Sequence, residues 1–447
     1  MRPPRLLAAV LVALAVALGA CSTTAPSTAV PDPDAQLPVI ELAGEWNWQR
    51  QAGPLELGVT HTEDSLDSEE PAEARQRGID ILSEGSAIWQ NHHLMGFGTL
   101  NPEPSPDEYS WATLDKRMQL TQDTGGGTVL TLCCAPDWMK GGEAGQTDWS
   151  ELETAPDPEY FDEFAELSAL AVQRYPQVER VLVWNELKGF YNHDENRWDY
   201  EGYTELYNQV YTAVKEVRPD VQVGGPYVVL TSLDPGSEDS SDVSGPWGVA
   251  DQRALDVVEY WLANNVGADF LVVDGSAQTR QGTMPEQVSD GAQKFADLTR
   301  WIGERTSLPV WWAEYYPDAP EGEVASATSP ASAVSTLAAV AAFAESDVAV
   351  ALHWGPQGHG LEHAALWTDS TRPDGGQPTP LTEAWQWLVP RLAAGEVEIG
   401  RSATAPLLAF RALDGVVVVN LTGEPVEVEP GSEPVDAWAI NVTHREF

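Results

Sequence analysis

Two glutamates in this sequence follow apolar runs in the same way. The run VLVW is followed directly by Asn185 and Glu186, and the run LPVWWA is followed by Glu314. Cleavage of a glycosidic bond needs two such carboxyl groups, one to protonate the departing oxygen and one to attack the anomeric carbon. An amide beside the acid can bind the sugar 2-hydroxyl as charge develops. Either glutamate alone would be interpreted as a solvated residue at the end of a strand. The two glutamates together with Asn185 indicate a catalytic site.

The elements that must position these residues alternate along the chain. Strand-like runs at 55–61, 88–98, 128–133, 180–186, 221–227, 269–274, 308–315 and 348–354 are separated by helical periodicity, as at 160–175, 203–217, 251–266, 286–306 and 332–345. Eight such units predict an α/β fold, a (β/α)8 TIM barrel over residues 41–395. No glycine-rich phosphate-binding motif follows any run, which removes the main reason to expect a nucleotide fold.

In such a barrel the chemistry lies at the carboxyl ends of the strands. Glu186 ends the fourth run and Glu314 ends the seventh. Strands four and seven lie across the barrel mouth from each other, so the two side chains are expected to face one another there.

On these residues the chain resembles the retaining hydrolases of glycoside hydrolase clan A. The phrases VWNELKGFY, VGGPY and NPEPSPDEYSWATLD resemble family 39, which includes β-xylosidases and α-L-iduronidases. The similarity covers roughly residues 55–394. It implies that Glu186 is the acid/base, that Glu314 is the nucleophile and that Asn185 donates to the sugar 2-hydroxyl.

One position departs from the clan's pattern. Members usually carry a His or Tyr after the sixth strand, bonded to the nucleophile, whereas this chain reads FLVVDGSAQ there, with Asp274 followed by Gly275. Asp274 is therefore a candidate for holding a water or a substrate hydroxyl near Glu314.

Other candidates for substrate binding are aromatic residues and histidines near strand ends. Trp354 after the eighth run and Trp138 after the third are candidate sugar platforms, with rim packing as the alternative. Tyr191 and Trp198 follow the acid and can shape the cleft. His61 is a candidate for bonding sugar hydroxyls, with a purely structural role equally open.

For His92 and His93 in the second run, as for His61, either a bond to sugar hydroxyls or a purely structural role is open. Acidic loops such as DENRWD fit no standard calcium-loop spacing. We expect neither a metal nor an organic cofactor, since two carboxyl groups suffice.

The charge of the chain limits its partners. It carries 69 Asp and Glu against 24 Lys and Arg, a formal net charge of −45. Such a surface excludes nucleic acid and anionic lipid surfaces as partners and disfavours strongly anionic polymers. The 18 tryptophans favour an oligo- or polysaccharide substrate.

The N-terminus has the pattern of an export signal. Residues 1–20 hold two arginines and the apolar stretch LLAAVLVALAVAL, and Gly19-Ala20 precedes Cys21 as in a bacterial lipoprotein box. Lipidation at Cys21 and a disordered tether over 21–40 are expected. The protein would then face outward as a cell-surface lipoprotein, touching the cytoplasmic membrane only through its lipid.

The other two cysteines, Cys133 and Cys134, are adjacent in an apolar strand. They cannot form a disulfide framework, and we expect buried free thiols, with a vicinal disulfide as the second possibility.

After residue 395 the pattern changes to short β-type runs between Gly and Pro turns. The runs at 407–413, 415–421, 425–429 and 435–443 predict a small β accessory region over 396–447, joined by the segment 46–48.

These observations predict a retaining glycoside hydrolase, β-xylosidase-like in the first instance. The alternatives are a non-catalytic carbohydrate-binding lipoprotein on the same barrel and a clan A endo-glycanase of other specificity. The sequence names neither the sugar nor the oligomeric state.

Overall fold

The computed structural model describes residues 41–320, 322–360, 363–429 and 431–444. The expected signal peptide, Cys21 and the tether lie outside this part of the chain. Within it, no helix is long and apolar enough to cross a membrane.

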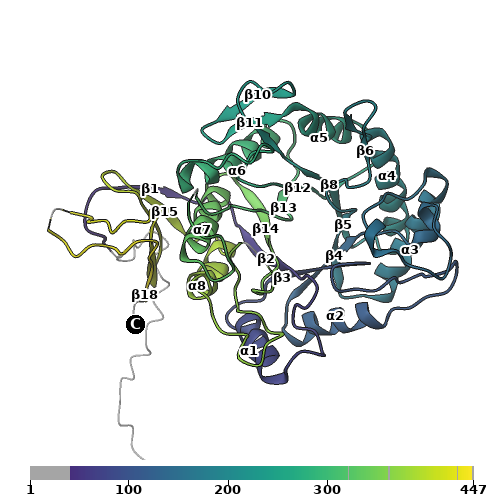
Figure 1. The fold of residues 1–447 in the computed structure, drawn as a ribbon, viewed down its shortest axis with the longest axis horizontal. Coiled ribbons are helices and arrows are strands. Elements are labelled where there is room, and N and C mark those ends of the chain that lie inside the picture. Colours follow the sequence, from purple (N-terminus) through teal and green to yellow (C-terminus); the bar gives the residue numbers. More distant parts are fainter. Residues whose placement is uncertain (1–40, 321, 361–362, 430, 445–447) are drawn as a thin grey trace, which may run out of the picture. The chain divides into compact units, whose positions relative to one another are not determined.

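Eight parallel strands close into a barrel (Figure 1). In order around the barrel they are β2 (Glu56–Thr60), β3 (Trp89–His93), β4 (Gly127–Leu132), β5 (Val178–Val183), β8 (Gln222–Val229), β12 (Phe270–Asp274), β13 (Val310–Trp312) and β14 (Val348–Trp354). Each coincides with one of the eight predicted runs, so the predicted (β/α)8 TIM barrel is confirmed. The runs are readable because strands buried on both faces are almost continuously apolar.

A helix follows every barrel strand and covers it from outside (Figure 1). These helices are α1 (Ala72–Ser83), α2 (Ala112–Asp123), α3 (Phe161–Arg174), α4 (Tyr200–Val217), α5 (Gln252–Asn264), α6 (Val288–Gly303), α7 (Pro330–Glu345) and α8 (Thr382–Ala393). The helix α7 starts with a proline at its first turn and a capping Ser329, and is buried from Ala331 to Ala344. It is apolar all round because it lies between the barrel and a second sheet.

That second sheet has the antiparallel order β1 (Trp46–Arg50), β15 (Glu398–Ser402), β16 (Leu407–Ala412), β17 (Gly415–Asn420) and β18 (Ile440–His444). Its strand β17 contacts α7, and β18 contacts α8. The predicted segment 46–48 does join this sheet. The predicted strand at 425–429 is wrong, since only a bridge between Val426 and Val435 forms there.

Short elements fill the loops above the strand ends. They are the 3-10 helices Asp137–Lys140, Trp149–Glu151 and Pro158–Tyr160, the pair β6 (Tyr191–Asn192) and β7 (Arg197–Trp198), and the three-stranded group β9 (Ser232–Leu233), β10 (Ser240–Gly245) and β11 (Gly248–Asp251).

The barrel interior is a separate small core beneath the carboxyl ends of the strands. It includes Val129, Leu182, Phe270 and Trp311, all at most 2% exposed. The rings of Phe270 and Trp311 stack at a centroid distance of 4.1 Å. This filled interior makes the strand ends a rigid platform for side chains that point upward from it.

Candidate active site

Glu314 lies two residues beyond the end of β13 and is 2% exposed. Its backbone continues the barrel ladder, because the amide of Ala313 donates to the carbonyl of Val273. The two carboxylate oxygens each accept one hydrogen bond, from the hydroxyl of Tyr227 at 2.5 Å and from that of Tyr316 at 2.5 Å. Glu314 is therefore fixed in orientation by two neutral donors.

Tyr227 reaches Glu314 because of an irregularity in β8. In the pairing of β8 with β12, Val272 lies opposite Pro226 and Val273 lies opposite Val228, so Tyr227 is skipped. The residue has a left-handed φ of 54°, as expected where a bulge re-aims a side chain. Its ring is buried in the barrel interior, and its hydroxyl donates to Glu314 from β8, the fifth strand of the barrel.

Glu186 lies on a tight turn and not on a strand. The predicted run extends to Glu186, but β5 ends at Val183 because Trp184 and Glu186 have positive φ values of 69° and 50°. The turn is held closed by the Trp184 indole, which donates to the carbonyl of Lys188 at 2.8 Å, and by the Lys188 amide, which donates to the carbonyl of Asn185 at 3.1 Å. Such strained backbone persists only where the surroundings hold it, and it is common at active sites.

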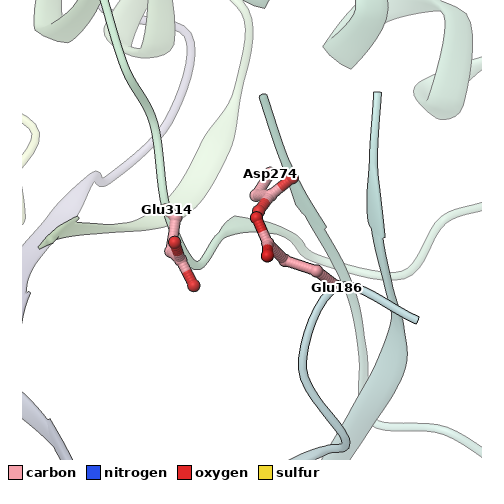
Figure 2. Close-up of side chains that lie close together, drawn as sticks. All are labelled: Glu186, Asp274 and Glu314. Atoms are coloured by element: carbon pink, nitrogen blue, oxygen red, sulfur yellow. The ribbon is translucent and has the colours of Figure 1, made fainter. Parts of the chain in front are cut away.

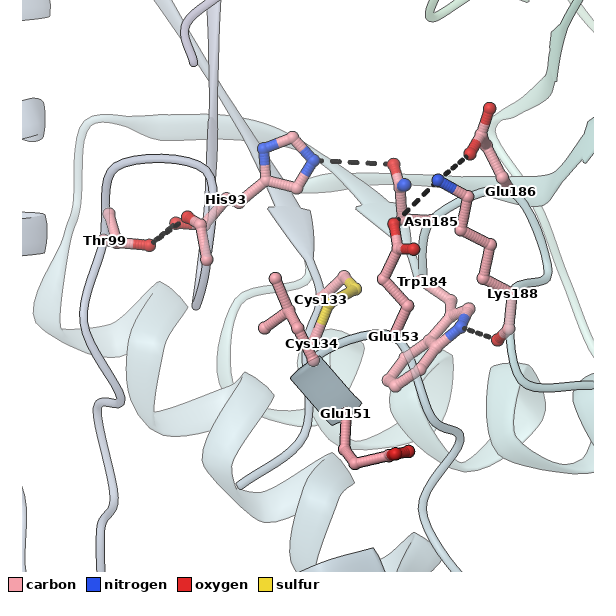
Figure 3. The surroundings of a disulfide bond; sticks show 12 residues. His93, Thr99, Cys133, Cys134, Glu151, Glu153, Trp184, Asn185, Glu186 and Lys188 are labelled. Carbon is pink, nitrogen blue, oxygen red and sulfur yellow. Dashed lines mark hydrogen bonds and ion pairs between the residues drawn. A yellow bond between two sulfur atoms is a disulfide. The ribbon is translucent and has the colours of Figure 1, made fainter. Parts of the chain in front are cut away.

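Lys188 forms an ion pair with Glu186. Its Nζ lies 2.5 Å from Oε2 of Glu186 and 2.7 Å from Oε1 of Glu153 (Figure 3). Burial lowers the pKa of Lys188, but the two carboxylates outweigh burial and raise it above its ordinary range. Lys188 is therefore a permanent cation beside Glu186, and sequence reasoning missed it.

Asp274 completes a cluster of three carboxyl groups. It is the last residue of β12 and is fully buried. One oxygen each from Glu186, Asp274 and Glu314 lie within 4.8 Å of one another, and the side chains of Asp274 and Glu186 point at each other (Figure 2). The sequence therefore placed all three residues at the same end of the barrel correctly.

The crowding of carboxyl groups disfavours their charged forms. Burial, and then the charge of Glu186, raise the pKa of Glu314 to about 8, although the hydroxyls of Tyr227 and Tyr316 and the charge of Lys188 oppose this. Burial, followed by the charges of Glu186 and Glu314, raises the pKa of Asp274 well above its usual value. The spacing of the three oxygens also suits cation ligands, so the expected lack of a metal stays a prediction.

An aromatic wall stands beside Asn185. Trp354 at the end of β14 makes edge contacts with His93, at 5.7 Å between ring centroids, and with Phe97 at 5.3 Å. A ring nitrogen of His93 lies 3.5 Å from Oδ1 of Asn185 (Figure 3). Trp354 is partly exposed while Asn185 is buried. This arrangement is compatible with the platform role that we predicted for Trp354.

Three other predicted substrate ligands have their polar atoms engaged by the protein. His61 is buried and bonded through both ring nitrogens, to Ser65 at 2.7 Å and to Gln90 at 3.2 Å, so the structural role fits it better. The hydroxyl of Tyr191 bonds to Asn196 and Arg253, and the indole of Trp138 donates to the carbonyl of Glu103. Tyr191 and Trp138 keep partly exposed rings, so their roles stay predictions.

His92 and Trp198 also lie inside the protein. One ring nitrogen of His92 bonds to Thr121 at 2.8 Å, and its ring stacks on His61 at 4.8 Å. Trp198 is 8% exposed and makes an edge contact with Tyr191. The histidine that lies beside the acid turn is therefore His93.

Cys133 and Cys134 form a vicinal disulfide directly after β4, so the expectation of free thiols is wrong (Figure 3). Both residues are fully buried, and the chain holds them in place because the amide of Met95 donates to the carbonyl of Cys133. Sequence reasoning gave precedence to free thiols because adjacent cysteines match no disulfide framework. What it could not supply was the backbone turn that brings the two sulfurs together.

Two tyrosines that orient Glu314 were also missed. Tyr227 ends the VGGPY phrase near the carboxyl end of β8, and Tyr316 follows Glu314 by two residues, so both lie toward the end of the barrel where functional side chains are expected. The position of the two tyrosines in the chain was the signal that could have identified them. The bulge that turns Tyr227 inward depends on pairing with β12 and could not be read from one strand.

Comparison with known proteins agrees with this fold. The model of the family described as "Glycosyl hydrolases family 39" matches residues 105–349. No curated protein matches the chain.

Among solved structures, a monomeric beta-xylosidase from Caulobacter crescentus CB15 aligns with a TM-score of 0.56 and 16% identity, over 86% of this chain and 77% of the other. The family 39 enzyme from Xanthomonas axonopodis pv. citri aligns with a TM-score of 0.54 and 15% identity, over 85% and 74%. A conserved exported protein from Bacteroides fragilis aligns with a TM-score of 0.54 and 12% identity, over 84% of this chain and 89% of the other. At these identities the structural matches establish the shared fold.

Proposed function

The chain belongs to glycosyl hydrolases family 39, and we propose that it cleaves glycosides with retention of anomeric configuration, with Glu314 as nucleophile and Glu186 as acid/base. The observation that supports this most is the separation of the two carboxyl groups. Their nearest oxygens lie within 4.8 Å. Retaining enzymes hold the pair about 5–5.5 Å apart, whereas inverting enzymes need about 6.5–9.5 Å to admit a water molecule.

In the first step, the Glu314 carboxylate attacks the anomeric carbon and the bond to the leaving oxygen breaks. Glu186 gives its proton to that oxygen, so that a glycosyl ester of Glu314 and a free alcohol result. In the second step, Glu186 takes a proton from water, whose oxygen attacks the same carbon from the opposite face and expels Glu314. Two inversions restore the original configuration.

The neighbours of each glutamate suit these roles. Two hydroxyls bind the oxygens of Glu314 and fix the orientation of this carboxylate. Lys188 forms an ion pair with Glu186 and so holds this carboxyl group in position. Asn185 lies next to Glu186, where its side-chain amide can bind the sugar 2-hydroxyl. Trp354 provides a surface on which a sugar ring can stack.

Neutral sugars, β-xylosides first, are the proposed substrates. A uronide would bring its own carboxylate toward three carboxyl groups and a protein of net charge −45. The nearby cations are already engaged, since Lys188 binds Glu186 and Glu153, and the buried Lys294 donates to Ser232 and to the carbonyl of Ser276. β-xylosides should therefore be hydrolysed faster than iduronides that carry the same leaving group.

Removal of the acid/base tests this assignment. Glu186→Ala should cleave activated aryl glycosides at the first step but stall as the glycosyl ester, because no base activates water. Azide needs no base, so it should restore turnover and yield a glycosyl azide with the configuration of the substrate. Glu153→Ala, which removes the other partner of Lys188, is the matched control and should show no azide dependence.

Azide rescue at neither glutamate would overturn the two-carboxylate assignment. Sugar binding without turnover by the unmodified protein, over a broad panel of aryl glycosides and polysaccharides, would instead support a non-catalytic carbohydrate-binding protein.

We also propose that the protein is an exported lipoprotein anchored through Cys21. The support is the Leu-Gly-Ala-Cys stretch after an apolar segment. Cys21→Ser should release the protein from the membrane fraction, whereas Ser22→Ala should leave it there. Unchanged fractionation of the Cys21→Ser variant would contradict the anchor.

A further inference from the structure

Asp274 is a buried carboxyl group without a conventional donor. It is fully buried, and neither of its oxygens has a hydrogen-bond partner among the residues that the structure describes. A fully buried carboxylate in that position would lose its hydration and gain no N–H or hydroxyl in return. That costs several kcal/mol unless the group is neutral or finds a partner.

The surroundings of Asp274 add to the cost of a charge. Its side chain points toward the carboxyl group of Glu186 (Figure 2), and one oxygen each of Glu186 and Glu314 lie within 4.8 Å of an oxygen of Asp274. Two carboxyl groups in contact are stable only when a proton lies between them.

Within the described part of the chain, no cationic side chain forms an ion pair with Asp274. Lys188 in the turn after β5 is held by Glu186 and Glu153. Lys294 on α6 is fully buried and donates to Ser232 and to the carbonyl of Ser276. Burial lowers the pKa of Lys294 to about 7, so it is in part uncharged near neutrality.

The remaining groups around Asp274 are also committed elsewhere. The hydroxyls of Tyr227, on β8, and Tyr316, after β13, donate to Glu314. Asp318, which follows β13, accepts from Ser276 at 2.6 Å. The groups named here, all in the described part of the chain, are thus either acids or donors that are already used.

We propose that Asp274 is a neutral carboxylic acid whose O–H donates to the carboxyl group of Glu186 and so positions the acid/base. This inference rests on the proposed function of Glu186. A protonated aspartate has one O–H donor and a planar shape, which fits a single bond to a neighbouring carboxyl oxygen. The group occupies the place where the clan has a donor to the nucleophile, but here it serves the other glutamate.

The proton count is consistent through both steps. The reactive form has a proton on Asp274, a proton on Glu186 and a charged Glu314, which is the minority state of Glu314 below its pKa of about 8. When Glu186 protonates the leaving oxygen it becomes an anion, while Glu314 becomes a neutral ester. Asp274 keeps its proton and donates to the new anion, so the bond is strongest when Glu186 has just given up its proton. Water returns the proton to Glu186 in the second step.

The backbone supports a fixed donor at this position. The carbonyl of Asp274 accepts from the amide of Leu230 at 2.8 Å, and Asp274 lies opposite Val229 on β8. The side chain therefore projects from a strand end that is paired on one side, with little freedom to turn away from Glu186.

Two substitutions separate a neutral donor from an anion. Asp274→Asn keeps a neutral donor of nearly the same shape, whereas Asp274→Val removes the donor. With a poor leaving group, Asp274→Val should lose about 10- to 100-fold in kcat/KM, the usual effect of losing a hydrogen bond to a charged group. Asp274→Asn should lose less than Asp274→Val. With an activated aryl glycoside, which needs little acid assistance, the two variants should differ little.

Asp269 offers a matched control at the other end of the same strand. It lies one residue before β12, bonded to the amide of Val223 and paired with Lys215. Asp269→Asn and Asp269→Val should affect good and poor leaving groups equally. Thermal unfolding of all four variants identifies any that fail to fold.

An infrared difference spectrum provides a readout that does not depend on activity. Near neutral pH, the unmodified protein minus Asp274→Asn should show the C=O stretch of a protonated carboxyl group. Its absence would overturn the proposal, as would an Asp274→Asn variant as impaired as Asp274→Val, which would identify an anion that binds a cation or a substrate donor. Nearly unchanged kinetics of Asp274→Val would also overturn it. An unmodified protein that shows the C=O band but hydrolyses no glycoside would contradict the proposed function and leave the neutral state of Asp274 standing.

Discussion

The two catalytic glutamates of the proposed mechanism stand in opposite environments. Glu314 is 2% exposed and receives two hydroxyl donors, and no cation of the described residues forms an ion pair with it. Glu186 lies on a turn, in contact with the cation of Lys188 and beside the acid Asp274. The first environment fixes one direction of attack, and the second allows a group to lose and regain a proton.

This difference shows how a barrel assigns two roles to one residue type. Neutral hydroxyls favour the carboxylate of Glu314 without adding net charge to the place where a sugar cation develops. Glu186 instead has the cation of Lys188 on one side and the carboxyl group of Asp274 on the other. Both arrangements come from residues at the ends of neighbouring strands.

The largest effect should come from removing the charge of the nucleophile. Glu314→Gln keeps the shape and both tyrosine contacts but cannot form a glycosyl ester, so kcat should fall by more than about 10⁴-fold on every substrate, activated or not. Steady-state kinetics on an activated aryl glycoside measure this. Residual activity within tenfold of the unmodified enzyme would place the nucleophile elsewhere.

The hydroxyl of Tyr227 should have the next largest effect. Tyr227→Phe removes a bond to the Glu314 carboxylate, which should lower kcat/KM by about 10- to 100-fold and raise the pKa of Glu314 further. Because the nucleophile acts as an anion, the acid limb of the pH profile should move to higher pH.

Tyr315→Phe is the matched control for Tyr227→Phe. Tyr315 is a buried neighbour of Glu314 whose hydroxyl has no partner among the described residues. Its loss should leave the pH profile in place. Equal effects of both substitutions would show that packing, and not the hydrogen bond, matters at Tyr227.

On the other glutamate, the test is removal of the cation. Lys188→Met removes the ion pair that holds the Glu186 side chain, so kcat/KM with a poor leaving group should fall by about tenfold. Lys188→Arg keeps the charge and should lose less. Equal kcat/KM values for Lys188→Met and the unmodified protein would show that the ion pair does not position the acid.

The smallest effect should appear in stability. The pKa of Glu314 is raised from an ordinary 4.5 to about 8, so the folded state holds its proton more tightly than the unfolded state does. This contribution to stability is complete below the unfolded value and is lost as pH rises through about 8.

Glu314→Gln lacks this dependence. It should melt above the unmodified protein at pH 8 by a margin that shrinks toward pH 5, whereas Glu383→Gln on α8 should show no such trend. A margin that is the same at both pH values would contradict a raised pKa at Glu314.

The sequence was most informative where burial dictates composition. All eight barrel strands stand out as apolar runs because both faces of each are covered, and strand order then placed Glu186, Asp274 and Glu314 at one end. Strand ends were less predictable. The run containing Glu186 looked continuous, but the positive φ at Trp184 had already ended β5.

What the sequence did not reveal depends on contacts between distant segments. The bulge at Tyr227 is defined by its pairing with β12, and the ion pair of Lys188 needs Glu153 from another loop. The strand β15 was missed because its sequence, EIGRS, is short and half polar and becomes a strand only between β1 and β16. The accessory region after residue 395 could therefore be predicted only in outline.

The most direct test of the central claim is the configuration of the first product. Proton NMR during hydrolysis of a β-xyloside, or of whichever aryl glycoside the enzyme cleaves fastest, records the anomer that forms before mutarotation. Because the nearest oxygens of Glu186 and Glu314 lie within 4.8 Å of each other, the first sugar released should have the anomeric configuration of the substrate. An initial product of inverted configuration would contradict attack by Glu314 and, with it, the division of roles between the two glutamates.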